Sequence, residues 1–320
     1  MEKFRVEKGI TLIALIISII ILLILAVVTI GNMTNRDIIT YAQNASRDYT
    51  TKKDEEKTEI NKYEDFLESE KLGMGKEKIS ATESYVGYYA DIDADGTVDG
   101  IIYADLAVGG SGQYGESDED TVTGGKYEIT KKENLNNYYI SQKSYKVNGF
   151  EEKAVISPIE KVEENDRFYV MTLTNFKVGE NETFSWYYNA EENWENLVKD
   201  ITSEEFGTGK ENTKSIMEVW KKEEFGKQYE KDIWNFIDSQ ISKGWFVPSK
   251  CEMAAFGDLA EKNGLDSTNY QEYGFDTISC WTSSQSTYLR CPWFIDFSDM
   301  CMYTIDLMIV DTNIRLSTTF

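Results

Sequence analysis

The chain has 320 residues, a formal net charge of −23 and no histidine. This length allows one large or two ordinary domains, and the strong negative charge repels phosphate backbones, so no nucleic-acid partner is expected. The lack of histidine excludes Ser-His and Cys-His catalysis and removes the commonest transition-metal ligand.

The segment 10–30 reads ITLIALIISIIILLILAVVTI and contains no charged residue. About 20 apolar residues are enough to cross a hydrocarbon core as one helix, so a transmembrane helix is predicted here. Lys3, Arg5 and Lys8 precede it. The positive-inside rule then predicts a single-pass protein of the cell membrane with its C-terminal domain extracellular. A secretory signal would have a shorter apolar core and a small-residue cleavage site.

The stretch Lys8-Gly9-Ile10-Thr11-Leu12-Ile13 resembles the processing signal of type IV pilins and pseudopilins. The resemblance implies a leader over 1–9, cleavage by a prepilin peptidase between Gly9 and Ile10, methylation of Ile10, and other pilins as partners. Ala14 stands where most of that family carries a glutamate that guides filament assembly. This departure favours a minor pilin or a simple anchor, and an ordinary signal anchor is the alternative interpretation.

Beyond the apolar segment, the chain has the pattern of a helical stalk. Ile38, Ile39, Ala42 and Ala45 fall at helical spacings, and a charged run without proline continues to Glu70. The transmembrane helix and the stalk are therefore predicted to occupy 10–72, ending near a glycine.

From about residue 80 the pattern changes to short strands. The runs 85–90 and 101–104 flank an acidic turn, which predicts a hairpin. In that turn Asp91, Asp93, Asp95 and Asp99 occupy positions 1, 3, 5 and 9 of an EF-hand-like calcium loop, and a glycine stands at position 6. Position 12 is Ile102 rather than glutamate. The turn is therefore either a calcium site or a plain acidic hairpin.

Later segments alternate between strands and helices. The aromatic and β-branched runs 167–173 and 184–188 predict strands, and apolar spacing predicts helices over 212–222 and 229–242. Ser249 and Glu252 have the spacing of a capping box, which predicts a helix from there to about residue 263.

The segment Trp245 to Glu252, together with the stretch Cys280-Trp281-Thr282-Ser283-Ser284, Trp293, Phe297 and Ile314-Arg315-Leu316, resembles the C-type-lectin-like fold. The similarity is to the branch of formylglycine-generating-enzyme-like domains and variable proteins of diversity-generating retroelements. It implies a C-type-lectin-like ligand-binding domain over 80–320, with its motifs in 244–320. The implied fold class is α+β, a twisted antiparallel sheet with flanking helices, joined to the long N-terminal transmembrane and stalk helix.

Between those framework positions the sequence shows neither alternation nor a helical repeat. In retroelement-diversified relatives, copying errors convert asparagine codons into codons for residues that cover most of this segment, although its methionines require lysine-type template codons. The resemblance therefore implies a hypervariable binding face, and the alternative is a last strand and loop of drifted sequence. The face comprises Ser286, Thr287, Tyr288, Leu289, Arg290, Cys291, Phe294, Asp296, Ser298, Asp299, Met300, Cys301, Met302, Tyr303, Thr304, Asp306, Leu307, Met308, Ile309, Asp311 and Asn313.

An enzymatic function is not expected. Cys291 and Cys301 lie ten residues apart, without the setting of a reactive thiol pair. A disulfide between Cys251 and Cys280 and four free cysteines are both compatible with the sequence. The calcium-chelating sugar motifs of ordinary C-type lectins are absent.

These features predict a surface-displayed adhesin or minor pilin that binds a protein or cell-surface ligand and attaches to the membrane through its N-terminal helix. No cofactor is established by the sequence, and calcium is the one candidate. The alternative is a structural pilin or pseudopilin subunit of a pilus or secretion system, whose head only packs against its neighbours.

Overall fold

The computed structural model describes most of the chain beyond residue 75 and part of what precedes it, and the chain forms two compact units, 1–67 and 68–320. The described residues are 12–33, 46, 49–53, 56–57, 60, 76–115, 125–147, 149–159, 165–186, 201–222, 231–266, 268–275, 279–286, 291–297, 301–304 and 311–320. The predicted leader over 1–9, with Gly9 and Ile10, and most of the predicted stalk lie outside them.

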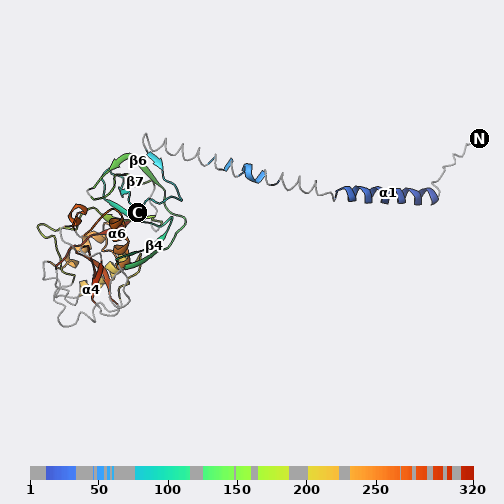
Figure 1. The fold of residues 1–320 in the computed structure, drawn as a ribbon. Helices are drawn as coiled ribbons and strands as arrows, with labels where there is room; N and C mark the ends of the chain where they lie inside the picture. The colour runs from blue at the N-terminus through green and yellow to red at the C-terminus, as the bar shows by residue number, and fades with distance from the viewer. Residues whose placement is uncertain are drawn as a thin grey trace, which may run out of the picture. The chain divides into compact units, whose positions relative to one another are not determined.

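In the first unit, α1 (Leu12–Met33) is a helix of 22 residues (Figure 1). Within the described residues, no helix combines the length and the apolar character needed to cross a membrane. This finding contradicts the predicted transmembrane helix and the predicted single-pass membrane localisation.

The described strands of the second unit form a seven-stranded, a three-stranded and a two-stranded sheet. The first has the order β1 (Lys76–Lys78), β6 (Tyr138–Tyr145), β7 (Lys153–Pro158), β2 (Tyr89–Ala90), β3 (Gly100–Asp105), β8 (Phe168–Thr172), β12 (Ser317–Thr319). The second has the order β11 (Cys301–Thr304), β10 (Pro292–Asp296), β9 (Ser279–Gln285), and the third pairs β4 (Gly110–Tyr114) with β5 (Gly125–Ile129). The described helices of this unit are α4 (Gly209–Lys222), α5 (Trp234–Ile241), α6 (Lys250–Lys262) and the 3₁₀ turn η2 (Tyr270–Tyr273).

The expected fold class is wrong in three respects. The described residues are mainly sheet, divided over several sheets, and they include no long N-terminal transmembrane helix. The large sheet is also not purely antiparallel, because Tyr89 of β2 pairs with Val155 of β7 in parallel. Such a pairing joins segments more than sixty residues apart, so no local pattern in the sequence reveals it.

Local predictions succeeded better. The predicted hairpin is present, with Tyr89 opposite Ile101 in an antiparallel β2–β3 pair, and the run 167–173 contains β8. A Cβ atom on Gly100 would lie 2.3 Å from the carbonyl oxygen of Met171, so β3 can approach β8 this closely only with glycine at its first position.

Helix α6 begins where the capping box predicted. The Ser249 side chain accepts a hydrogen bond from the Glu252 backbone N–H, and the Glu252 carboxylate accepts one from the Ser249 N–H at 2.7 Å. The same carboxylate also accepts from Gly207 and Gly209, so it holds the first residue of α4 as well. One buried side chain therefore joins the N-terminal ends of two helices, α4 and α6.

Alternation along the strands gives the large sheet two buried faces. Ile101, Tyr103 and Met171 pack with α6 in the largest core, whereas Ile102 and Val170 belong to a separate core on the other face. Both faces of the sheet are therefore apolar and covered.

A third core joins α4 and α5 to the three-stranded sheet. Trp186, Trp234 and Trp281 are buried there, and the Trp281 indole N–H donates to the Phe184 carbonyl at 2.9 Å. Trp281, Trp293 and Phe297 are three of the positions expected to be framework, and all three are buried, as expected for framework residues.

Candidate functional site

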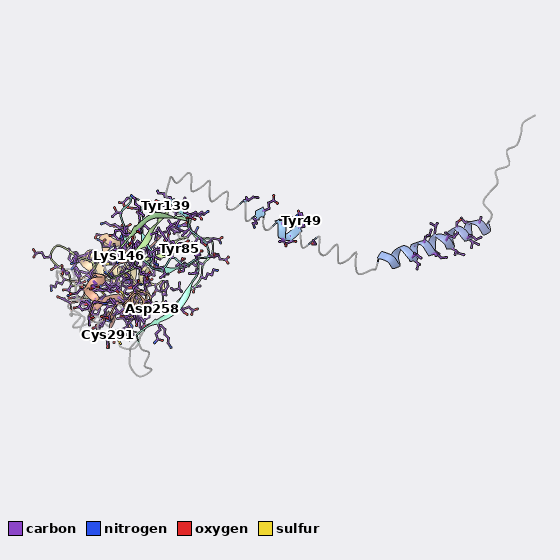
Figure 2. The ribbon with its side chains drawn as sticks, turned by 45° about the horizontal axis from the view of Figure 1, so that its top comes forward. Tyr49, Tyr85, Tyr139, Lys146, Asp258 and Cys291 are labelled. Atoms are coloured by element: carbon purple, nitrogen blue, oxygen red, sulfur yellow. The ribbon has the colours of Figure 1, made fainter. Side chains whose placement is uncertain are left out.

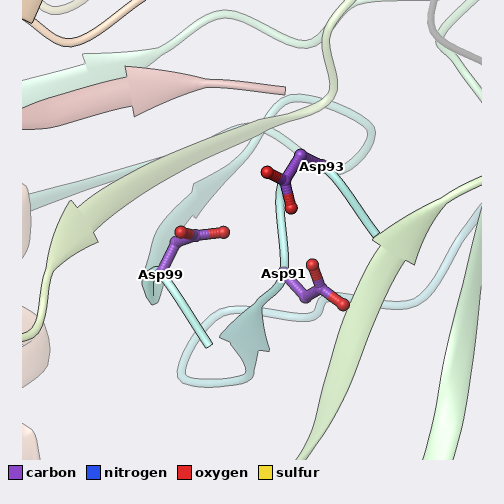
Figure 3. A group of neighbouring side chains, drawn as sticks. All are labelled: Asp91, Asp93 and Asp99. Atoms are coloured by element: carbon purple, nitrogen blue, oxygen red, sulfur yellow. The ribbon is translucent and has the colours of Figure 1, made fainter. Parts of the chain in front are cut away.

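The acidic turn lies between β2 and β3, and its carboxylates converge. Asp91 directly follows β2 and Asp99 directly precedes β3, so the hairpin brings the two ends of the turn together. One oxygen atom from each of Asp91, Asp93 and Asp99 lies within 4.8 Å of the others (Figure 3). Two oxygens bound to the same Ca²⁺ ion at 2.3–2.6 Å are at most about 5 Å apart, so this spacing fits one shared ion.

Backbone amides of the turn are folded around the first carboxylate. The Asp91 carboxylate accepts hydrogen bonds from the N–H groups of Asp95 at 3.1 Å and Gly96 at 3.0 Å. Gly96 has a φ of 92°, and a Cβ atom there would meet nothing within 4 Å, so its backbone conformation rather than lack of space explains the glycine. At the other end, Asp99 accepts from the Ile92 N–H at 2.8 Å.

Within the part of the chain that the structure describes, no lysine or arginine side chain forms an ion pair with the carboxylates of the turn. Burial raises the pKa of the Asp91 carboxyl, and the hydrogen bonds that this carboxyl accepts only partly offset that effect. Burial also raises the pKa of Asp99, and repulsion by Asp93 and Asp91 adds to it. Both carboxyl groups therefore hold their protons more tightly than usual, which a bound cation would reverse.

The predicted ligand set is only partly assembled. Asp95, the expected ligand at position 5, is not in the group of three, and its carboxylate accepts from the Thr97 N–H at 2.7 Å. Ile102, at position 12, is fully buried in the core. Ser157 of β7 was missed, although it donates to Asp91 at 3.2 Å, because it lies 66 residues further along the chain and nothing local marks it.

The second candidate site is the C-terminal segment 286–313. Phe294 lies opposite Tyr303 in the β10–β11 ladder, and both side chains are partly exposed. Their rings are 5.8 Å apart, and Phe294 also packs edge-on against the buried Trp281 of β9 at 5.6 Å. An aromatic row thus crosses the three strands on one face of the sheet. Asp296, Cys301, Thr304 and Asp311 are also partly exposed.

Other members of the predicted face are in the interior. Met302 is fully buried against the large core, opposite Ile295, so its expected exposure is wrong. Ser286, Cys291 (labelled in Figure 2) and Asn313 are buried as well. The alternation of a strand explains Met302, because its neighbour Tyr303 takes the outer position. This alternation could not be recognised in the sequence, because polar and apolar residues occur on both faces of the strand.

The strands also separate the predicted residues in space. The chain leaves β9 beside Pro292, since Gln285 pairs with that residue, and it leaves β10 beside Cys301, since Asp296 pairs with it. These two residue pairs lie at opposite ends of β10, because Pro292 is its first residue and Asp296 its last. The predicted residues therefore do not all share one end of the sheet. Thr287, Tyr288, Leu289, Arg290, Ser298, Asp299, Met300, Asp306, Leu307, Met308 and Ile309 lie outside the described residues.

The four cysteines are free. The disulfide between Cys251 and Cys280, one of the two alternatives, is therefore not formed. Burial raises the pKa of the Cys251 thiol to about 11, which is the opposite of what a nucleophilic cysteine needs.

Comparisons with known proteins add little. No family model matches the chain, and no curated protein is similar enough to match it. Among solved structures, a fimbrial protein from Bacteroides ovatus is similar over 73% of this chain and 69% of its own, at 14% sequence identity and a TM-score of 0.29. The likeness is compatible with a pilus-related surface protein and, at this TM-score, carries no argument about fold or function.

Proposed function

We propose that this chain is a pilus-related surface protein that binds a protein or cell-surface ligand through a partly exposed aromatic surface of the three-stranded sheet. The observation that supports the proposal is the aromatic pair of Phe294 and Tyr303. Both rings are partly exposed beside the third core, against which Phe294 packs, whereas Ile295 and Met302 on the opposite face are fully buried. Exposed aromatic rings on a rigid strand pair are typical anchors of a binding site.

A ligand-binding role and a purely structural role predict different patterns of substitution in this sheet. In a binding protein, the buried residues of the β10–β11 ladder hold the strands in place. The partly exposed residues of the same strands determine which ligand binds. Diversification by a retroelement would then alter residues such as Phe294 and Tyr303 and preserve Ile295 and Met302. Sequencing a population of the gene should show substitutions concentrated at outward positions of 286–313. An even distribution over inward and outward positions would contradict diversification.

The direct test uses the full chain, fluorescently labelled, on a panel of bacterial and epithelial cells measured by flow cytometry. Wild-type protein should bind at least one cell type. The double variant Phe294→Ser with Tyr303→Ser should lose that binding while its melting temperature stays close to that of the wild type. Val86→Ser is the control, since Val86 is exposed at 36% on another part of the head.

A structural pilin subunit would give a different result. It would bind none of the cells, and it would form filaments that electron microscopy can detect. Equal binding by wild type and double variant would place the ligand elsewhere on the head.

The acidic turn supports a second proposal, a calcium site. Asp91, Asp93 and Asp99 would supply carboxylate oxygens to the ion, and water and backbone oxygens would complete the shell. Because Asp91 also accepts from Ser157 of β7, an ion held there would stiffen the contact between the turn and the parallel β2–β7 pair. Isothermal titration of the full chain with CaCl₂ tests it, and the absence of a saturable heat up to millimolar calcium would exclude it.

A further inference from the structure

Among the described residues, one face of the seven-stranded sheet is covered by a segment that forms no helix. Seven residues of this face are buried together: Ala90, Ile102, Tyr138, Ile156, Phe168, Val170 and Phe320. Ile79 and Tyr85, from the segment that leads from β1 to β2, complete this core. We call residues 79–88 the strap. It contains turns and bends and no strand or helix.

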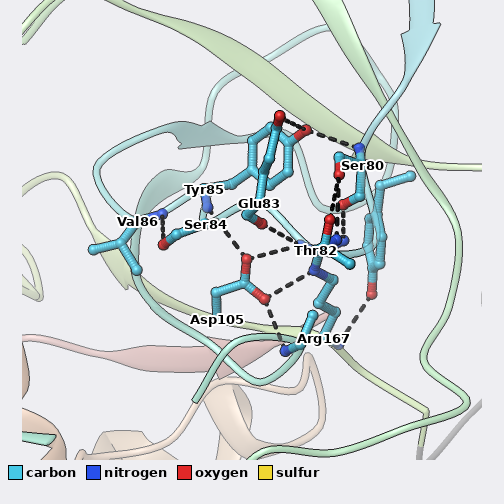
Figure 4. A network of polar contacts seen from close by, with 10 residues as sticks. Ser80, Thr82, Glu83, Ser84, Tyr85, Val86, Asp105 and Arg167 are labelled. Carbon is cyan, nitrogen blue, oxygen red and sulfur yellow. Dashed lines mark hydrogen bonds and ion pairs between the residues drawn. The ribbon is translucent and has the colours of Figure 1, made fainter. Parts of the chain in front are cut away.

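A buried ion pair lies under the strap (Figure 4). Arg167 Nε donates to Asp105 Oδ1 at 2.8 Å and Arg167 Nη2 to Asp105 Oδ2 at 2.9 Å, a bidentate contact between side chains exposed at only 4% and 0%. Asp105 is the last residue of β3, and Arg167 directly precedes β8. The pair is therefore fixed by two neighbouring strands of the sheet.

The strap is fastened to this pair by its backbone. Arg167 Nη1 donates to the Ser80 carbonyl and Nη2 to the Glu83 carbonyl, both at 2.8 Å, and the Tyr85 N–H donates to Asp105 Oδ2 at 3.2 Å. The Tyr85 ring lies over the guanidinium, 5.3 Å from its carbon atom.

The remaining contacts of the strap are at its ends or within it. Ile79 donates to the Tyr138 carbonyl, and Gly87 donates to the Ile102 carbonyl. Between them, the Ser80 N–H donates to the Tyr85 hydroxyl, which is a bond inside the strap. Among the described residues, the hydrogen bonds that join 80–86 to the rest of the head all go to Arg167 and Asp105.

We propose that the strap is a cover that opens separately from the sheet and that the Arg167–Asp105 pair is its latch. When the latch is broken, residues 79–88 detach and leave the apolar face with Tyr138 and Phe168 open to solvent. Local opening of this kind is favoured where few residues are buried and the backbone is weakly paired. Only Ile79 and Tyr85 of the strap are buried, and the bonds of 80–86 to the rest of the head all go to the latch. The proposal does not depend on the ligand or on the cation.

The test must separate the latch from a general loss of stability. Removing only Arg167 leaves Asp105 as an uncompensated buried charge, which destabilises the whole head. The double variant Asp105→Asn with Arg167→Met has neither charge, retains most of the buried volume, and still lacks the donors to the Ser80 and Glu83 carbonyls. Hydrogen exchange of the full chain, followed by mass spectrometry of its peptides, gives the readout.

In the double variant, the melting temperature should be higher than in Arg167→Met. Peptides that cover 79–88 should still exchange at least about tenfold faster than in the wild type, because the latch bonds are gone. Peptides of β3 and β8 should keep wild-type protection. The fluorescence of a dye that binds exposed apolar surface should rise. The control Lys177→Met removes an exposed ion pair with Glu182, outside the strap, and should change none of these readings.

Two results would overturn the proposal. Wild-type protection of 79–88 in the double variant would mean that the packing of Ile79 and Tyr85 holds the strap without the latch. An equal loss of protection in the strap and in β3 and β8 would mean that they open as one unit. A failure of cell binding would leave the proposal untouched, since none of these measurements involves a ligand.

Discussion

Ile295 of β10 and Met302 of β11 lie opposite each other in the antiparallel ladder, and both side chains are fully buried. One position away, Phe294 faces Tyr303 on the other side of the same two strands, where both are partly exposed. Substitutions at the neighbouring residues Met302 and Tyr303 should therefore have very different effects on the free energy of unfolding.

Replacement of Met302 by Ala should lower the free energy of unfolding by roughly 2–5 kcal/mol, because a cavity forms in the core. Tyr303→Ala should change it by about 0.5 kcal/mol or little more, since a partly exposed site loses few contacts. Urea denaturation of the two variants side by side measures the difference. Equal effects would mean that the alternation along β11 has been assigned to the wrong faces.

Calcium should raise the melting temperature at pH 7, because an ion that binds only the folded state stabilises it. Asp93→Ala, which removes one of the three converging carboxylates, should remove that rise, and Asp266→Ala, in a different turn, should retain it. The raised pKa values of Asp91 and Asp99 set the pH dependence. Protons compete with the cation more strongly as pH falls, so the rise should shrink between pH 7 and pH 4. A calcium effect that grew at low pH would point to a different site.

Glu252 should make the head less stable as pH rises. Burial raises the pKa of this carboxyl from 4.5 to about 7, and the hydrogen bonds that it accepts from Ser249, Gly207 and Gly209 oppose the shift without cancelling it. The folded state thus binds the proton more tightly, so this contribution is complete below pH 4.5 and is lost as pH rises to about 7. Relative to Glu252→Gln, the wild type should lose roughly 3 kcal/mol over that interval. Urea denaturation at several pH values compares the two slopes, and parallel slopes would contradict the prediction.

Processing of the N-terminus remains a prediction that rests on the sequence. If a prepilin peptidase cuts between Gly9 and Ile10, intact-mass spectra of the purified protein should show Ile10 as the first residue, carrying one methyl group. Gly9→Val should block the cut by crowding the scissile bond. Detection of Met1 in the wild-type protein would remove the pilin interpretation.

Features that depend on a few neighbouring residues could be predicted from the sequence. The capping box of Ser249 and Glu252 was visible because its partners lie three residues apart, and the β2–β3 hairpin because its turn is local. The acidic turn was visible for the same reason. Its three converging carboxylates come from within nine residues, Asp91 to Asp99.

Features that depend on distant partners could not be predicted. The parallel pairing of Tyr89 with Val155, the bond from Ser157 to Asp91 and the ion pair of Asp105 with Arg167 each join segments that no periodicity connects. The inward position of Met302 failed for another reason. Its strand is only four residues long, which is too short for an alternation to be recognised.

The order of strands in the large sheet has a consequence for folding kinetics. Ser317 of β12 pairs with Met171 of β8, and Val155 of β7 pairs with Tyr89 of β2. Contacts between such distant segments form slowly, because a long loop must close before any pairing compensates for its entropy. During synthesis, the edge of β8 that pairs with β12 remains unpaired until the ribosome has released residues 317–319. We expect this head to fold late and to need protection from edge-to-edge aggregation in the meantime.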